Sequence, residues 1–405
     1  MTQQPILPHF RAHAWPLLLV LALLIATACA ASPTTDDGRS TAITRQRSAS
    51  ATLAPSPTVE PSATPTATPA PSPTATVVPS ATPSPTPAGL SEAELAEMRP
   101  NELGWALVME YHLIEPGEDA EYSRTPDSLR ADLAWLYDNG YYPITFRDLA
   151  SANFDSVPAG RSPVVLTFDD SSIGQYNILA DGSIDPESAM GILLAFHKAH
   201  PDFPPIATWF PLLEVDVPSR ILWGQPEWVD QKLQHILELG GEIGSHTVTH
   251  NRLDQLEESQ IQWQLGTSQR TLEERIGGGY DVVSLALPLG IYPANEALIQ
   301  AGTVDGVPYG YLYAAEVAGG MTVVPYAASW DPIHIARAPA AAGYIDALMG
   351  QIERRPSLKY ISDGDPTTLT FPSEATLDEE QQGTFDAARW PDLVVRRYDR
   401  ALSDE

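Results

Sequence analysis

From residue 105 onward, apolar runs of strand length alternate with longer stretches that place apolar residues at helical spacing. Short Val- and Leu-rich runs predict buried strands, whereas apolar residues three and four positions apart predict amphipathic helices. The expected strands cover residues 105–112, 142–146, 164–168, 206–210 and 281–287, followed by a pair at 309–315 and 321–325. The expected helices cover residues 126–139, 186–200, 226–239, 253–276 and 340–353. This alternation predicts an α/β fold with a parallel sheet or barrel and helices outside it.

Two adjacent carboxylates, Asp169 and Asp170, end the apolar run that begins at Val164. Buried charges need a partner or a metal ion, so such a pair is costly inside a core. Because successive side chains on a strand point to opposite faces, we expect the pair where the strand stops. In α/β folds, catalytic and binding groups collect at these carboxyl ends of strands.

Two histidines, His246 and His250, follow a second short strand signal and are four residues apart. On a helical turn this spacing places both imidazoles on one face, where they can hold a single ion. With Asp170 they would form a site of two nitrogens and one oxygen with positions open for water, a pattern typical of catalytic metals. Asp169 would then be free to act as a base. The alternative is a solvated acid pair and two unrelated surface histidines.

These segments resemble motifs of the polysaccharide deacetylases of the NodB-homology family, carbohydrate esterase family four. Thr167-Phe168-Asp169-Asp170 looks like the T-F-D-D motif, and His246-Thr247-Val248-Thr249-His250 looks like H-[ST]-x-x-H. The resemblance covers roughly residues 104–350 and implies a distorted (β/α) barrel. It also implies that Asp169 is the catalytic base and that Asp170, His246 and His250 bind a divalent metal, with zinc as the expected ion.

Pro288-Leu289-Gly290 resembles the third motif of the family, which helps to form the substrate site. Many relatives carry an arginine just before it, whereas Ala286 and Leu287 occupy those positions here. In relatives that arginine helps to hold the catalytic aspartate, so its absence predicts a less firmly held Asp169 with a raised pKa. The alternative is that Pro288-Leu289-Gly290 is a plain turn at a strand end.

The general acid is harder to identify. The fifth motif of the family usually supplies a histidine for this role, and only Ile333-His334-Ile335-Ala336-Arg337 stands in its place. His334 is a candidate acid, whereas Arg337 is similar to a P-R-[IV] stretch of other relatives. His112, which ends the first expected strand in a Y-H pair like that of the family, is interpreted as structural.

Residues 1–31 resemble a secretory signal, with an apolar run from Trp15 to Ala28 that is short for a membrane span. The run closes on Ala26-Thr27-Ala28-Cys29, which is similar to a lipobox. We therefore expect lipid on Cys29, export, and anchoring of the protein to the membrane at the cell surface. The alternative is ordinary cleavage after Ala28. Because Cys29 is the only cysteine, an internal disulfide is excluded.

Residues 32–100 are predicted to form a disordered linker, since residues 51–88 hold 11 prolines among mainly Ser, Thr and Ala. This leaves an expected catalytic domain at 101–353 and a C-terminal extension at 354–405. The chain carries a net charge of −29, and because residues 1–90 carry +1, residues 91–405 carry −30. This negative field argues against nucleic acid as a partner.

The resemblance of these motifs implies a metal-dependent hydrolase that removes N-acetyl groups from a polysaccharide, and we expect the protein to be a monomer. The family resemblance implies a glycan such as peptidoglycan, chitin or poly-N-acetylglucosamine. Two other classes stay open, namely a non-catalytic carbohydrate-binding surface lipoprotein and a metal hydrolase of a non-glycan amide. The missing third-motif Arg and fifth-motif His favour the binding protein, whereas the intact Asp-Asp and His-x-x-x-His set favours an enzyme.

Overall fold

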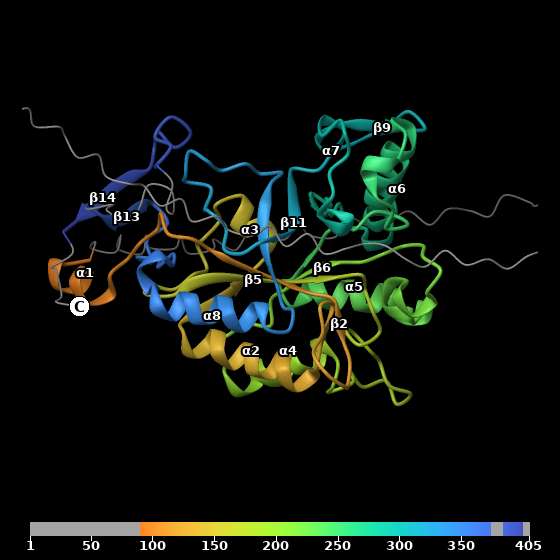
Figure 1. Cartoon of the computed structure of the whole chain (residues 1–405), viewed down its shortest axis with the longest axis horizontal. Helices are drawn as coiled ribbons and strands as arrows, with labels where there is room; N and C mark the ends of the chain where they lie inside the picture. The colour runs from red at the N-terminus through yellow and green to blue at the C-terminus, as the bar shows by residue number, and fades with distance from the viewer. Residues whose placement is uncertain (1–89, 374–383, 400–405) are drawn as a thin grey trace, which may run out of the picture. The chain divides into compact units, whose positions relative to one another are not determined.

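The computed structural model describes residues 90–373 and 384–399 of the chain (Figure 1). The expected signal segment, Cys29 and most of the expected linker therefore lie outside the described residues. None of the described helices is long and apolar enough to cross a membrane. The first described helix, α1 (Glu92–Met98), is capped by Ser91 and buries Leu95, so regular structure begins within the range expected to be linker.

A parallel sheet forms the centre of the fold, with the strand order β7-β6-β5-β1-β12-β11-β8. Its strands are β1 (Leu107–Tyr111), β5 (Ser162–Asp169), β6 (Thr208–Phe210), β7 (Glu242–Ile243), β8 (Ser284–Ala286), β11 (Tyr313–Gly319) and β12 (Ile335–Pro339). A bridge between Ser245 and Leu285 joins the two outer strands. The sheet is therefore nearly closed, and the predicted distorted (β/α) barrel is confirmed.

Helices cover the outer face of this sheet (Figure 1). They are α2 (Pro126–Asp138), α4 (Ala189–Ala199), α5 (Val229–Glu238), α6 (Glu258–Ile276) and α8 (Tyr344–Arg354). Each begins or ends within a few residues of its predicted bounds. Their buried apolar residues form one large cluster with Val164, Leu166 and Phe168 of β5. Burial of this apolar surface is the main stabilising contribution to the barrel.

Strand β5 is the most deeply buried element, with all eight of its residues buried. Strand β4 (Tyr141–Ile144) pairs with its first half, and β6 pairs with its last three residues on the same edge. Because side chains alternate along a strand, Val165, Thr167 and Asp169 face the inside of the barrel, opposite to the helix-facing residues. Val165 accordingly belongs to the second apolar cluster, and Asp169 closes the inward-facing row.

The register of the central strands brings polar residues to one level. Glu110 of β1 pairs with Thr167 of β5, and the neighbouring Met109 pairs with Ala338 of β12. Arg337 on β12 therefore lies beside the end of β5, although it is 168 residues away in sequence. This register places the Arg337 guanidinium beside Asp169, although Arg337 lies outside the sequence motif that contains the Asp pair.

The strand pair expected at 309–315 and 321–325 is not formed. Instead β11 continues to Gly319 and pairs in parallel with both β8 and β12, between which it lies in the sheet. Residues 321–325 form no strand, and their β-pairing is limited to a bridge between Thr322 and Ala106. An antiparallel hairpin occurs earlier, between β9 (Gly302–Val304) and β10 (Val307–Tyr309).

The C-terminal residues return to the start of the domain. Strands β13 (Thr368–Pro372) and β14 (Val394–Tyr398), within the expected C-terminal extension, form a parallel pair. Buried Glu102 accepts hydrogen bonds from the backbone amides of Thr370 and Asp363. Burial raises the pKa of Glu102 to about 8. The two backbone donors oppose this rise, because they partly replace the water that the carboxylate loses.

Candidate metal centre and active site

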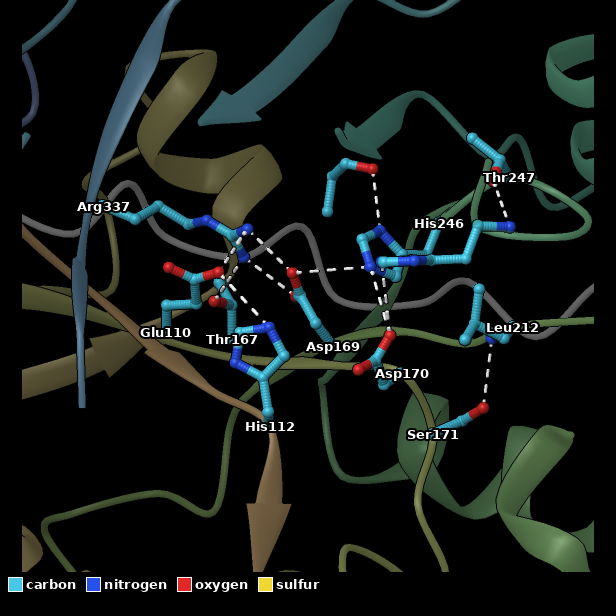
Figure 2. Close-up of polar contacts among 12 residues, drawn as sticks. Glu110, His112, Thr167, Asp169, Asp170, Ser171, Leu212, His246, Thr247 and Arg337 are labelled. Atoms are coloured by element: carbon cyan, nitrogen blue, oxygen red, sulfur yellow. Dashed lines mark hydrogen bonds and ion pairs between the residues drawn. The ribbon is translucent and has the colours of Figure 1, made fainter. Parts of the chain in front are cut away.

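Polar side chains from four regions of the chain meet at the carboxyl ends of the central strands (Figure 2). The residues drawn there include Glu110 and His112 at the end of β1, Thr167, Asp169 and Asp170 at the end of β5, His246 after β7, and Arg337 on β12. The Asp pair and the His pair, which are more than 70 residues apart, are thus brought together. Two groups can be distinguished within this site, one around Asp170 and one around Asp169.

The first group consists of Asp170, His246 and His250. Asp170 Oδ1 lies 3.5 Å from His246 Nε2 and 3.6 Å from His250 Nε2. One possible ligand atom of each residue lies within 4.8 Å of the other two. The three residues proposed from sequence as metal ligands therefore converge on one point.

The state of these groups fits a divalent cation. His246 Nδ1 lies 2.8 Å from the carbonyl oxygen of Ala286, so Nδ1 donates there and Nε2 keeps its lone pair. His246 Nε2 and Asp170 Oδ1 are buried without a hydrogen-bond partner. Burial lowers the pKa of both histidines, that of His250 to about 3, so both imidazoles are neutral at pH 7. A metal ion would satisfy both unpartnered atoms, and two neutral imidazoles with a carboxylate suit zinc.

The backbone of both segments is held in an uncommon conformation. Asp170 and Ser171 have φ values of 71° and 44°, and Thr247 and His250 have φ values of 67° and 57°. Positive φ is uncommon outside glycine, and such residues cluster at functional sites. A continued strand would send the Asp170 side chain outward like that of Phe168. The left-handed turn at Asp170 directs it toward the histidines instead.

The expected helical turn between His246 and His250 is absent, because residues 244–250 form a loop. The two imidazoles nevertheless lie with ring centroids 4.8 Å apart. Gln264 of α6 fixes the loop, since its Oε1 accepts hydrogen bonds from the amides of Val248 and Thr249, each 3.0 Å long. The i, i+4 spacing therefore brings the histidines together through a left-handed loop and not through a helix.

Arg220, which ends the short helix η1 (Pro218–Arg220), was not singled out by the sequence. Its guanidinium contacts Oδ2 of Asp170, the oxygen directed away from the histidines. Ser171 holds this arrangement by donating a hydrogen bond of 2.7 Å to the carbonyl oxygen of Arg220. Arg220 thus orients the carboxylate and leaves Oδ1 for the metal position.

The second group is centred on Asp169, which is completely buried. Arg337 binds it in a bidentate ion pair, with Nη1 2.8 Å from Oδ1 and Nη2 2.7 Å from Oδ2. Burial alone would raise the pKa of Asp169, but the Arg337 guanidinium outweighs it and holds the pKa below its usual range. Thr167 Oγ1 accepts a further bond of 3.0 Å from Arg337.

This geometry corrects the expectation drawn from the missing third-motif arginine. Ala286 and Leu287 are buried apolar residues, as the sequence indicates, yet Asp169 is firmly held. The guanidinium comes from β12 instead of from the turn after β8. The pKa of Asp169 is therefore lowered, and the predicted rise is wrong.

Glu110 and His112 form the remaining wall of the site. His112 Nε2 lies 3.6 Å from Glu110 Oε1, and the same Glu110 oxygen accepts a 3.1 Å bond from Arg337. Burial raises the pKa of Glu110 and lowers that of His112 to about 4. Ligand atoms of Glu110, His112 and Asp169 also lie within 4.8 Å of one another, but Arg337 already supplies a cation there. His112, interpreted from sequence as structural, thus lies within the active-site cluster.

The third-motif segment forms the short helix η5 (Pro288–Gly290). Leu289 adopts a φ of 59° and is 50% exposed, whereas Pro288 is buried. A Cβ on Gly290 would lie 3.0 Å from Val317, so the close approach to β11 favours glycine. The segment follows the carbonyl of Ala286 that orients His246, and its role in binding substrate stays a prediction.

His334 is held outside the two groups. Its ring nitrogens each lie 3.1 Å from a carboxylate, those of Glu296 and Glu316, and the ring stacks on Tyr292. Burial opposes protonation, but the two carboxylates outweigh it and raise the pKa of His334. Among the described residues, no hydrogen bond or ion pair joins His334 to Asp169, Asp170 or their partners. His112 thus lies in the cluster around Asp169, whereas His334, the candidate acid from the sequence, does not.

Residues 156–304 match the sequence model of one family, described as polysaccharide deacetylase. This match spans β5, the Asp pair, the His pair and the third-motif segment, and it confirms the family resemblance. No curated protein matches the chain.

Solved structures with a similar fold come from several bacteria. The Streptococcus pyogenes deacetylase PplD, solved with acetate, is 19% identical, with 60% of this chain and 98% of that one covered at a TM-score of 0.44. A polysaccharide deacetylase from Bacillus cereus is 18% identical, with 60% and 69% covered and a TM-score of 0.44. IcaB from Ammonifex degensii is 14% identical, with 61% and 96% covered and a TM-score of 0.41.

Proposed function

We propose that this chain, whose residues 156–304 match polysaccharide deacetylases, is a metal-dependent enzyme that removes N-acetyl groups from an extracellular polysaccharide. The observation that carries the proposal is the adjacency of two unlike groups at one strand end. Asp170, His246 and His250 converge, His246 Nε2 and Asp170 Oδ1 have no hydrogen-bond partner, and Asp169 beside them is fixed as an anion by Arg337. A cation site next to a buried carboxylate suits hydrolysis of an amide.

Asp170, His246 and His250 would hold the metal. When bound, a divalent ion at this position supplies a Lewis acid that polarises the acetamide carbonyl and activates water. Asp169 accepts the proton of the attacking water, since its Oδ2 lies 3.9 Å from His246 Nε2 and thus close to the ion position. Water adds to the carbonyl carbon, the C–N bond breaks, and acetate and an amine leave.

The leaving nitrogen needs a proton, and Glu110 and His112 have side-chain atoms within 4.8 Å of Asp169 on the side away from His246 (Figure 2). We assign this pair the role of proton donor. Burial raises the pKa of Glu110 to about 8 and lowers that of His112 to about 4, so Glu110 carries the proton and His112 is neutral. This assignment replaces His334, whose ring is occupied by Glu296 and Glu316.

The experiment that tests the function is acetate release from a panel of N-acetylated substrates. The panel contains peptidoglycan, chitin oligomers, poly-N-acetylglucosamine and a set of non-glycan acetamides, each incubated with zinc-loaded protein. Release from a glycan supports the proposal. Release only from the non-glycan amides supports the other hydrolase class, whereas glycan binding without release supports a carbohydrate-binding protein.

We also propose that the protein is exported and that lipid on Cys29 anchors it to the membrane. The support is the sequence alone, in which the only cysteine follows an apolar run and a lipobox-like Ala26-Thr27-Ala28. Membrane fractions of the native host, compared for wild type and Cys29→Ser, test this. Equal partitioning of the two proteins would contradict the anchor.

A further inference from the structure

A groove of about 290 Å³ lies at the loop that carries His250. One wall is formed by Thr249 and Asn251, which flank the metal-site residue His250 in sequence. The other wall is formed by Leu256 and by four side chains of α6, namely Ser259, Gln260, Trp263 and Gln264. The groove therefore shares a loop with the candidate metal centre.

Trp263 gives this groove its character. It is 41% exposed, although tryptophan is one of the residues that gains most from burial. Its neighbours on α6, Ile261 and Leu265, are buried and face the core, so Trp263 is not needed to fix the helix on the barrel. An aromatic side chain left exposed in a concave surface is a feature of binding sites.

Apart from Leu256, the other side chains of the groove are neutral and polar. Amide and hydroxyl groups of Asn251, Ser259 and Gln260 can donate to and accept from a ligand, and no lining residue carries a charge. This neutrality contrasts with the net charge of −29 of the chain. An aromatic face with neutral amides and hydroxyls suits a sugar ring, which presents C–H groups on one face and hydroxyls around its edge.

The groove is held rigidly relative to the metal centre. Gln264 lines it and also accepts from the amides of Val248 and Thr249, within the loop that positions both histidines. The start of α6 is fixed by Gln260, whose Oε1 accepts a 3.1 Å bond from the Glu257 amide. A ring bound on Trp263 would thus have a fixed place relative to His250.

We propose that this groove binds one pyranose ring of a glycan chain whose neighbouring unit lies at the metal centre. The inference rests on the proposed function for the identity of the ligand as an N-acetylated glycan. It adds that the enzyme prefers oligomers over single sugars, because a substrate must be long enough to reach both places.

The test measures binding and turnover separately in the full chain. Asp169→Asn keeps the site but blocks turnover, so calorimetry with N-acetylglucosamine and its oligomers of two to six units, β-1,4- or β-1,6-linked, reports binding alone. Adding Trp263→Ala is expected to weaken hexamer and dimer binding about tenfold and binding of the single sugar less than twofold. In the otherwise wild-type chain, Trp263→Ala should raise KM for the hexamer by a similar factor and leave kcat unchanged.

Two variants serve as controls. Trp263→Phe keeps an aromatic face and should retain most of the hexamer affinity, while Leu312→Ala removes a 56% exposed side chain outside the groove and should change nothing. The groove proposal is overturned if Trp263→Ala binds the hexamer like its parent, or if no oligomer binds. Binding that depends on Trp263 without acetate release would instead remove the deacetylase function and keep the groove.

Discussion

Asp169 and Asp170 are chemically identical neighbours, yet the structure gives them opposite surroundings. Asp169 is the last residue of β5, faces the barrel interior and is locked by two hydrogen bonds from Arg337. Asp170 lies one residue beyond, in a left-handed turn, and keeps one oxygen without a hydrogen bond. The comparison shows that one residue of displacement at the strand end decides what surrounds a carboxylate. The last strand residue is paired with an arginine, whereas the next residue faces the candidate metal position.

The largest effect is expected for Asp169→Asn. An amide cannot accept the proton of the attacking water, so acetate release should fall by about 10² to 10⁴. Metal content, measured by elemental analysis of the same sample, should stay at the wild-type level. Loss of the ion with this variant, together with its retention in Asp170→Asn, would show that the two roles are reversed.

The next largest effect is the loss of stability expected when Arg337, the cation paired with Asp169, is removed. Arg337→Met leaves Asp169 and Glu110 as buried acids without their partner, which costs about 3–5 kcal/mol in the free energy of unfolding. The depressed pKa of Asp169 stabilises the fold above its unfolded pKa, and this contribution should be absent in the variant. Urea unfolding at pH 7 measures the loss.

A matched control for Arg337→Met is Arg124→Met, which breaks the other buried pair, with Asp132 at 2.5 Å. It should cost comparable stability. Where the variants are folded, only Arg337→Met should move the acid limb of the pH–rate profile to higher pH. An equal shift in both would mean that the effect is general and not due to Asp169.

On the Asp170 side, removal of a ligand should act on the metal first. His250→Ala and Asp170→Asn should each lower zinc affinity at least about tenfold, since even partners that only orient ligands contribute that much. Activity should recover in part with excess zinc, unlike that of Asp169→Asn. His235→Ala, which removes a half-buried histidine bonded to Tyr176, is the control and should keep its zinc.

The last effect concerns the acid stability of the metal-free protein. His250 and His112 have pKa values lowered to about 3 and about 4, so below the ordinary value near 6.5 only the unfolded chain takes up these protons. Each should reduce the free energy of unfolding by about 1.4 kcal/mol per pH unit as the pH falls from 6.5 toward 4. Chelator-treated protein unfolded by urea across this range measures the slope, and His112→Gln should make it shallower. An unchanged slope would contradict the burial of a neutral His112.

Sequence patterns predicted the barrel because strand and helix periodicities are local. The Thr167 to Asp170 segment and the His246 to His250 segment were recognisable for the same reason, since each is a short run of distinctive residue types. The conformation of the loop at residues 244–250 could not be predicted. An i, i+4 spacing is equally compatible with a helical turn and with the left-handed backbone at Thr247 and His250.

Arg337 shows what local patterns cannot supply. Its contact with Asp169 depends on β12 pairing with β1 and β1 pairing with β5, a register set by the whole sheet. The same holds for Arg220, which contacts Asp170 from the end of the short helix η1. The sequence signals available were a lone arginine after Ile335 and a charged Glu110 within an apolar strand, and both acquire meaning only through their neighbours.

Glu102 has a consequence for the order of folding. Its carboxylate is buried and bonded to the Thr370 amide, 268 residues later in the chain. A nascent chain that ends before residue 363 leaves this acid without its two backbone donors. Contacts of such long sequence separation slow folding. A truncation at residue 353 should therefore lower the free energy of unfolding, as urea unfolding would show.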